Sequence, residues 1–357
     1  MTHRERVLTA LSLRTPDRVP MFLNLSPDLR QATERVISTT DLLGFFDLDY
    51  APELSVKREP TSKTTDFARF FSDIPSGATF SEWGEMSYPA DFHHFRGYRP
   101  PMAGFSTVAE IEAYPFPDID AEHRYQTCQQ QVRSVQSKGY PAVSAYECGF
   151  FEQAHGLRGM QNLLVDLKIN PAFAWALLER IAVRKIASAV NYAKAGVDVV
   201  FIGDDFGIER SLIMQIETWR EYFKPLLVQC VSAIRSARPN VLIAFHSCGH
   251  IEPLVPELIE CGIDVLESVQ AEANDASKLK GLYGDSLAFW GTIGVQSTFP
   301  FGTPAQVEEV VAQRILTVGK EGGLMIGPCH VIEPETPVAN VVAFVEAVKK
   351  HGQYSLP

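Results

Sequence analysis

The sequence predicts an α/β protein, with a single closed (β/α)8 TIM barrel as the first choice of fold and a doubly wound open sheet as the second. Short apolar runs alternate with helical patterns along most of the chain. These runs are apolar throughout, as in parallel strands that helices cover on both faces. Each run turns polar only at its last residues, where barrels place their active sites. The 357 residues suit one domain that spans residues 1–357.

The predicted helices are marked by their capping residues. Thr2 and Glu5 form a capping box for the first helix. Asn170 and Pro171 mark the start of a long helix, and Gly196 marks its end. By pattern and proline position, further helices are expected at about 120–137, 217–237, 253–261, 304–319 and from Pro337 onwards.

Strands are predicted from apolar, β-rich runs at 19–25, 141–147, 197–203, 241–247, 263–269, 287–293 and 323–329. One more strand, in FFDLDY or ELSVK between residues 40 and 60, would complete a barrel of eight. Residues 51–105 are rich in proline, glycine, serine and aromatic residues and show no sustained period. We expect them to form an elaborated region of loops and short strands at one end of the fold.

Composition limits the classes of function. A hydrophobic fraction of 46% and a charged fraction of 21% are typical of a soluble globular protein. The formal net charge of −11 disfavours nucleic acid and anionic membranes as partners. The N-terminus does not resemble a signal peptide, and no apolar run is long enough to span a bilayer. Six scattered cysteines suit a reducing cytoplasm.

Reactive side chains gather at the predicted carboxyl ends of the strands, which predicts a site at that end of the barrel. They are Tyr146 with Glu147, Asp204 with Asp205, His246 with Cys248, Glu267 with Gln270, and Cys329 with His330. Asp204 and Asp205 could contact a substrate or the surroundings of a metal, or could simply end the strand and cap the next turn. His330 could hold structure or substrate.

A metal site is predicted around FHSCGH. His246 and Cys248 are two residues apart and point to the same side of an extended strand. Catalytic zinc sites use three protein ligands and an open position, and the third ligand would be Cys329. The alternative is a buried cysteine beside a hydrogen-bonded histidine. His250 is expected at the start of the following helix, and the other four cysteines are expected to be small buried hydrophobes.

Five segments together resemble the uroporphyrinogen decarboxylase superfamily, in colinear order over essentially the whole chain. They are the opening THRERVLTALSLRTPDRVP, LRGMQNLLVDLKINP (157–171), GDDFG (203–207), FHSCGH (245–250) and GGLMIGPCHVIEPETPVANV (322–341). The resemblance implies a single (β/α)8 barrel, in agreement with the strand and helix pattern.

The resemblance also favours one branch of that superfamily. Uroporphyrinogen decarboxylases carry an arginine-rich segment that grips substrate carboxylates, whereas MFLNLSPDLRQA (21–32) has only Arg30. The other branch contains zinc methyltransferases that work with corrinoid proteins, including coenzyme M methyltransferases and the methyltransferase components of O-demethylases. Its zinc motif is His-x-Cys followed far downstream by Cys, which implies that His246, Cys248 and Cys329 are the Zn²⁺ ligands.

On this resemblance, the chain moves a methyl group between a small methoxylated, possibly aromatic, compound and a separate corrinoid protein that carries the methylated cobalamin. Corrinoid-to-thiol transfer is the close alternative, and a metal-independent decarboxylase or a structural zinc protein are the others. Catalytic roles are predicted for Glu147, Asp204 and Asp205, which could orient a substrate hydroxyl or supply a proton. Substrate contacts are predicted for Tyr146, Phe206 and His330.

Overall fold

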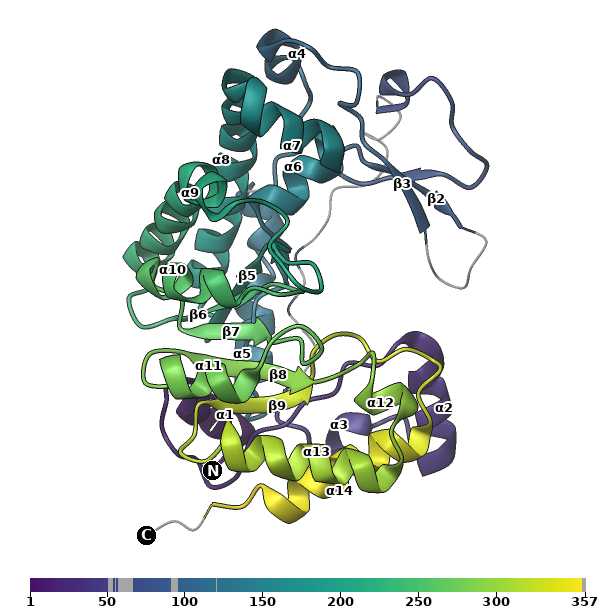
Figure 1. Cartoon of the computed structure of the whole chain (residues 1–357), viewed down its shortest axis with the longest axis vertical. Helices are drawn as coiled ribbons and strands as arrows, with labels where there is room; N and C mark the ends of the chain where they lie inside the picture. The colour runs from purple at the N-terminus through teal and green to yellow at the C-terminus, as the bar shows by residue number, and fades with distance from the viewer. Residues whose placement is uncertain (51–53, 55, 57–66, 91–95, 120, 355–357) are drawn as a thin grey trace.

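The computed structural model describes residues 1–50, 54, 56, 67–90, 96–119 and 121–354, and the predicted parallel α/β architecture is confirmed (Figure 1). Six parallel strands pair in the order of the chain. They are β4 Glu147–Cys148, β5 Val199–Gly203, β6 Leu242–His246, β7 Val265–Ser268, β8 Ala288–Ile293 and β9 Leu324–Pro328. Helices connect successive strands, as parallel pairing requires.

The predicted strand at 19–25 forms hydrogen bonds to β9 but is not a regular strand. The amide of Phe22 donates to the carbonyl of Ile326 at 3.1 Å, and the amide of Ile326 donates to Pro20 at 2.9 Å. Proline has no amide hydrogen, so Pro20 cannot continue the ladder as a donor. The remaining contacts are isolated bridges, at Met21 and Leu25.

Two further bonds involve the region in which the eighth strand was predicted. The amide of Asp49 donates to the carbonyl of Met21 at 2.9 Å, and the amide of Leu54 donates to Val143 at 3.2 Å. Val143 in turn bridges β5 at Val199. Part of FFDLDY belongs instead to the short helix α3 Leu42–Phe46, and most of ELSVK lies outside the described residues.

The capping predictions hold for the backbone and, in part, for the side chains. Helix α1 His3–Leu11 begins with the predicted capping box of Thr2 and Glu5. Helix α8 Pro171–Ala195 ends at Gly196, which adopts the left-handed conformation. Asn170 stands at the N-cap position of α8, but its side chain makes no capping bond there. The same residue also ends the preceding helix α7, and its carbonyl accepts the amides of the first turn of α8.

The other helices are α2 Pro27–Ile37, α4 Val108–Glu112, α5 Cys128–Ser137, α6 Phe150–Arg158, α7 Met160–Ile169, α9 Ile216–Ala237, α10 Val255–Glu260, α11 Ala276–Tyr283, α12 Thr298–Phe301, α13 Pro304–Thr317 and α14 Val338–His351. Short 3₁₀ helices precede α5 (Glu122–Tyr125) and α10 (Glu252–Leu254), so the helix predicted at 120–137 is broken in two. No helix in these described stretches is long and apolar enough to cross a membrane.

Residues of the region 51–105 that the structure describes include a small antiparallel sheet, as predicted. Its strands are β1 Thr79–Phe80, β2 Met86–Pro89 and β3 Arg96–Arg99. In Figure 1 this sheet stands apart from the parallel sheet, towards the end of the molecule where α6 and α7 lie. The elaborated region is therefore built onto one end of the fold.

Apolar cores lie on both faces of the parallel sheet, which explains why the strand runs are apolar throughout. Val200 and Ile202 of β5 belong to the large cluster that includes the helices. Their neighbours Val199 and Phe201 belong to a second cluster, together with Trp290 of β8. Successive side chains of a strand point to opposite faces, so each strand contributes to both clusters.

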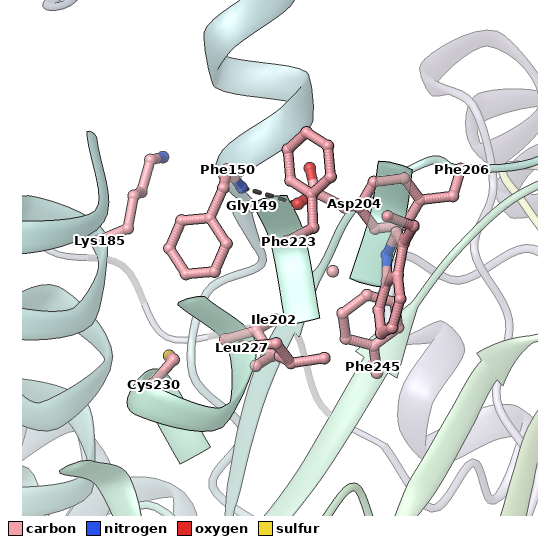
Figure 2. A pocket seen from close by; sticks show the side chains of 12 residues that line it. Gly149, Phe150, Lys185, Ile202, Asp204, Phe206, Phe223, Leu227, Cys230 and Phe245 are labelled. Atoms are coloured by element: carbon pink, nitrogen blue, oxygen red, sulfur yellow. Dashed lines mark hydrogen bonds between the residues drawn. The ribbon is translucent and has the colours of Figure 1, made fainter. Parts of the chain in front are cut away.

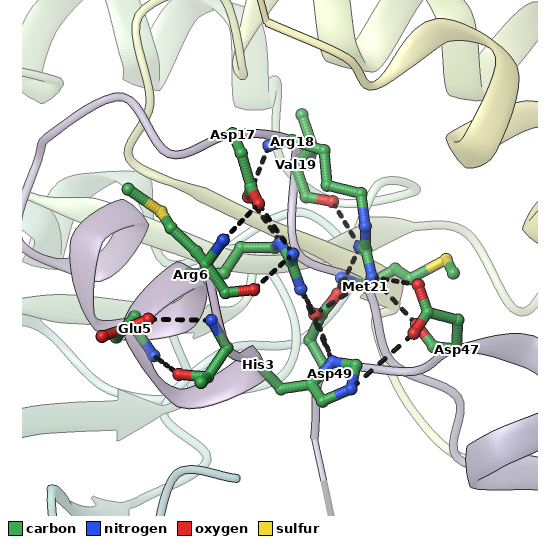
Figure 3. A network of polar contacts seen from close by, with 11 residues as sticks. His3, Glu5, Arg6, Asp17, Arg18, Val19, Met21, Asp47 and Asp49 are labelled. Carbon is green, nitrogen blue, oxygen red and sulfur yellow. Dashed lines mark hydrogen bonds and ion pairs between the residues drawn. The ribbon is translucent and has the colours of Figure 1, made fainter. Parts of the chain in front are cut away.

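A buried ion-pair network joins α1 to the segments that follow it (Figure 3). The carboxylate of Asp49 is fully buried. It accepts hydrogen bonds from Arg6 at 2.6 Å, from the amide of Met21 at 2.9 Å and from Arg18, and it lies 2.9 Å from Nδ1 of His3. Buried charge is tolerated only with such partners. The network therefore fixes the N-terminal helix against the chain that hydrogen bonds to β9.

Candidate active site

His246 and Cys248 lie together at the carboxyl end of β6, with Asp205 beside them. One ligand atom from each of these residues forms a group in which all atoms lie within 4.8 Å of one another. The Sγ of Cys248 is 3.4 Å from Nε2 of His246. An oxygen of Asp205 is 3.4 Å from the same nitrogen. Thiolate, imidazole and carboxylate are all ligands of zinc, so this group can hold a metal ion.

The position of His246 is set by Glu267 of the neighbouring strand β7. In the parallel register, His246 pairs with Glu267, and the carboxylate bonds to Nδ1 of the imidazole. This leaves Nε2 directed towards Cys248 and Asp205, and carboxylates commonly orient metal-binding histidines in this way. Burial lowers the pKa of His246, but the charge of Glu267 and the bond to Asp205 outweigh it and raise the pKa well above the usual value.

Cys329 follows β9 directly, as predicted, but lies outside the group of ligand atoms formed by the other three residues. It is 1% exposed. Burial raises the pKa of its thiol to about 12, with further contributions from Glu272 and Cys248. Among the described residues, the structure therefore brings Asp205 into the position that the sequence suggested for Cys329.

His250 lies near Cys248 in the sequence but is not part of this group. Its amide donates to the carbonyl of Ile208 at 2.6 Å. Its Nδ1 lies 2.9 Å from the carbonyl oxygen of Ala273. The residue precedes the 3₁₀ helix at Glu252–Leu254, which agrees with the position expected for it.

Asp204 and Asp205 point in different directions and have different partners. Asp204 is buried and caps α6: its carboxylate accepts the amides of Phe150 at 2.7 Å, Phe151 at 3.1 Å and Glu152 at 2.8 Å. Figure 2 shows the bond to Phe150. Burial raises the pKa of Asp204, although the three amides oppose this. Asp205 instead accepts the amide of Cys248 at 2.7 Å, which places it beside the candidate ligands.

We expect Asp204→Ala to lower the free energy of unfolding by about 2–3 kcal/mol, because three amides at the start of α6 lose their acceptor in a buried place. Urea denaturation measures this change. The control is Asp41→Ala, because Asp41 caps α3 through a single bond in an exposed place and its loss should cost less than about 1 kcal/mol. Equal losses in the two variants would contradict the buried capping role.

Glu152 is a site residue that the sequence interpretation did not identify. It lies in the first turn of α6, and one of its carboxylate oxygens accepts the hydroxyl of Tyr146 at 2.7 Å. The ring of Tyr146 stands edge-on to that of His246, with the centroids 5.2 Å apart. Burial and the nearby charge of Asp205 raise the pKa of Glu152. Its one sequence signal is an acidic residue in the helical turn that directly follows a strand end.

The other predicted site residues are placed as follows. Phe206 packs among Phe151, Trp219 and Phe223 in the larger core and is 2% exposed. His330 is exposed, and its charge is close enough to lower the pKa of Asp205. The backbone of Glu147 pairs with Ile202 of β5, while its side chain lies outside the described residues.

Phe206 also lines a cavity of about 30 Å³ on the outer side of the sheet (Figure 2). Ile202 of β5 and Phe245 of β6 form part of its wall, and both belong to the cluster that includes the helices. Lys185 and Asp204 are its charged lining residues. The cavity is large enough only for a few water molecules and is separate from the group around His246.

Comparison with known proteins assigns the chain to a family. The profile described as "Uroporphyrinogen decarboxylase (URO-D)" matches residues 2–351. The chain belongs to the uroporphyrinogen decarboxylase family. The resemblance predicted from the sequence is thereby confirmed, and the related proteins described next carry the names of methyltransferases and decarboxylases, which are enzymes.

Family members with different names are similar to this chain. Methylcobamide:CoM methyltransferase MtaA of Methanosarcina barkeri is 27% identical over 203 residues, which are 54% of this chain and 56% of that protein. The match therefore spans little more than half the length of that relative. Uroporphyrinogen decarboxylase of Anaeromyxobacter dehalogenans is 26% identical over 99% of both chains.

A solved structure shares the fold over nearly the whole chain. It is a methyltransferase from Methanosarcina mazei, with a TM-score of 0.70 and 18% identity over 98% of this chain and 99% of that one. At this identity the likeness concerns the fold alone. It agrees with the parallel α/β architecture described above.

Proposed function

We propose that this member of the uroporphyrinogen decarboxylase family is a zinc-dependent methyltransferase, which moves a methyl group between a small methoxylated compound and a separate corrinoid protein. The observation that carries the proposal is the convergence of the Nε2 of His246 and the Sγ of Cys248, 3.4 Å apart, at the carboxyl end of β6. The similarity to a methylcobamide:CoM methyltransferase supports the corrinoid partner.

The proposed ligands are His246, Cys248 and Cys329, with Asp205 as the alternative third ligand. The donor set fits zinc, because Glu267 occupies Nδ1 of His246 and leaves Nε2 for a metal. A bound zinc ion would act as a Lewis acid that holds and polarises the ether oxygen or thiol sulfur of the substrate. Asp205 holds the amide of Cys248, so it fixes the backbone from which the thiolate projects.

A closed barrel is part of this proposal. The hydrogen bonds of Pro20 and Phe22 with β9, of Asp49 with Met21 and of Leu54 with Val143 would join the two edges of the parallel sheet into a ring of eight strands. The carboxyl ends of β4 to β9 would then surround one mouth. The ligands and Tyr146 would face that mouth, and the corrinoid protein would dock over it.

The placement of Arg30 speaks against decarboxylation of a carboxylate-rich substrate. Arg30 lies on α2, is 52% exposed and pairs with Glu34 one turn later at 2.9 Å. Its charge is thus already paired, so it is poorly suited to gripping several substrate carboxylates. Methyl transfer from the corrinoid protein to a thiol is the second candidate function, supported by the name of the MtaA relative.

Methyl transfer to reduced cobalamin, cob(I)alamin, tests the proposal. The purified chain with one equivalent of zinc is expected to form methylcobalamin from a methoxylated arene, followed by the change in visible absorbance. The reverse assay supplies methylcobalamin and a thiol. Turnover that persists after a chelator has removed all metal, or no methyl transfer in either direction, would rule out the zinc methyltransferase.

A further inference from the structure

Glu152 is a carboxylate of the proposed active site that lies outside the set of metal ligands. It comes from α6, the helix that directly follows β4, and it is bonded to Tyr146 at 2.7 Å. Tyr146 contacts the ring of His246 edge-on, with the centroids 5.2 Å apart. The pair of Glu152 and Tyr146 therefore stands immediately beside a proposed metal ligand.

The position of this pair is fixed from below by Asp204. The amide of Glu152 donates to Asp204 at 2.8 Å, and the two amides before it donate to the other carboxylate oxygen. Figure 2 shows how the carboxylate of Asp204 meets the first amide of the helix. Asp204 is therefore a positioning residue, because it holds the helical turn that carries Glu152 and is itself fully enclosed.

The side chains around this position accept hydrogen bonds more readily than they donate them. The charge of Asp205 is close enough to raise the pKa of Glu152, so two carboxylates share this space. The nearby cation Lys185 lies 5.1 Å from the ring centre of Trp83, on the outer side of the sheet. A carboxylate offers about four acceptor positions, and the bond from Tyr146 uses one of those of Glu152.

We propose that Glu152 contacts the substrate and accepts a hydrogen bond from a hydroxyl group that neighbours the methylated atom. This inference rests on the proposed methyl transfer and names its substrate class: methoxylated compounds that carry a hydroxyl, in preference to the same compounds without one. Tyr146 keeps the carboxylate in place, and Asp204 acts only through the helix.

Direct binding tests the proposal without any catalytic turnover. The full chain with one equivalent of zinc is titrated calorimetrically with 2-methoxyphenol and, separately, with methoxybenzene. We expect the wild-type protein to bind 2-methoxyphenol about tenfold more tightly, as a charge-assisted hydrogen bond allows. Glu152→Gln should remove most of this ratio, leave the affinity for methoxybenzene unchanged and leave the zinc content unchanged.

Two further variants sharpen the result. Tyr146→Phe removes the donor that holds Glu152 and should also reduce the ratio of affinities, by less than Glu152→Gln does. Glu309→Gln is the matched control, because Glu309 is exposed on α13 and should behave like the wild type. A ratio that is the same in Glu152→Gln as in the wild type overturns the proposal, and so does a wild-type protein that binds both compounds equally.

The two proposals fail in different measurements. Absence of zinc, or of methyl transfer to cob(I)alamin, would count against the proposed function. The role of Glu152 is read from the ratio of two binding constants, which needs no corrinoid and no turnover. A protein that transfers methyl groups but shows no dependence of this ratio on Glu152 would retain its function and lose this substrate class.

Discussion

Replacing Cys248 by alanine is expected to lower the zinc content from about one ion per chain to less than about 0.3, because a three-ligand site loses one of its thiolates. Methyl transfer should fall with the metal. The Sγ of Cys248 is 3.4 Å from Nε2 of His246, so the two atoms already stand close enough to share one ion. Metal analysis after exhaustive dialysis measures the change.

The identity of the third ligand is decided by a pair of variants. If Cys329 is the third ligand, Cys329→Ala should lose zinc as Cys248→Ala does, while Asp205→Asn should retain most of it. The reverse result would show that Asp205 is the ligand, as the 4.8 Å group suggests. Cys128→Ala is the control: Cys128 is buried at the start of α5, away from the site, and its removal should not change the zinc content.

The fold was predictable because its signals are local. A capping box, a proline in the first turn and a glycine at the end mark helices from a few residues each, and α1 and α8 begin and end where those residues stand. The buried strands β5 to β9 follow from unbroken apolar runs. The segment at 19–25 is harder, because Pro20 removes a donor and leaves bridges in place of a continuous ladder.

The candidate site was predictable in position but only partly in detail. Any side chain at the end of a strand could face the mouth or the helices, because neighbouring residues point to opposite sides. Asp204 turned out to cap α6, and its neighbour Asp205 lies beside His246. Phe206 was assigned to the substrate by its place in the sequence, yet it packs in the helical layer. Sequence alone cannot choose between the two sides without the register.

Glu152 illustrates a second limit. Its contact with Tyr146 and its closeness to Asp205 depend on how α6 packs over the end of β4, which is a property of the tertiary structure. An acidic residue in the first turn of a helix is ordinarily explained by the helix dipole. Only the direction of the side chain distinguishes that ordinary role from a role in the site.

The largest effect on stability is expected at Asp49. Replacing it by alanine should lower the free energy of unfolding by about 3–5 kcal/mol, because it leaves buried arginines without their common partner. Asp49 has no exposed surface and accepts bonds from Arg6, Arg18 and the amide of Met21. Urea denaturation at pH 7 measures the loss. Glu34→Gln is the control, because it removes a surface pair with Arg30 and should change stability by less than about 1 kcal/mol.

The pH dependence separates a role of the Asp49 charge from simple packing. Burial would raise the pKa of Asp49, but the bond to His3 and the charge of Arg18 hold it below the usual value. A carboxylate whose pKa is lower in the folded state stabilises the fold above its unfolded pKa of about 4, and this stabilisation disappears as the pH falls towards the folded pKa. The isosteric variant Asp49→Asn should therefore differ most from the wild type at neutral pH, and the difference should shrink below about pH 4. A difference that stays constant from pH 7 to pH 3 would mean that Asp49 stabilises the N-terminal helix by its shape and hydrogen bonds, and that its charge contributes nothing.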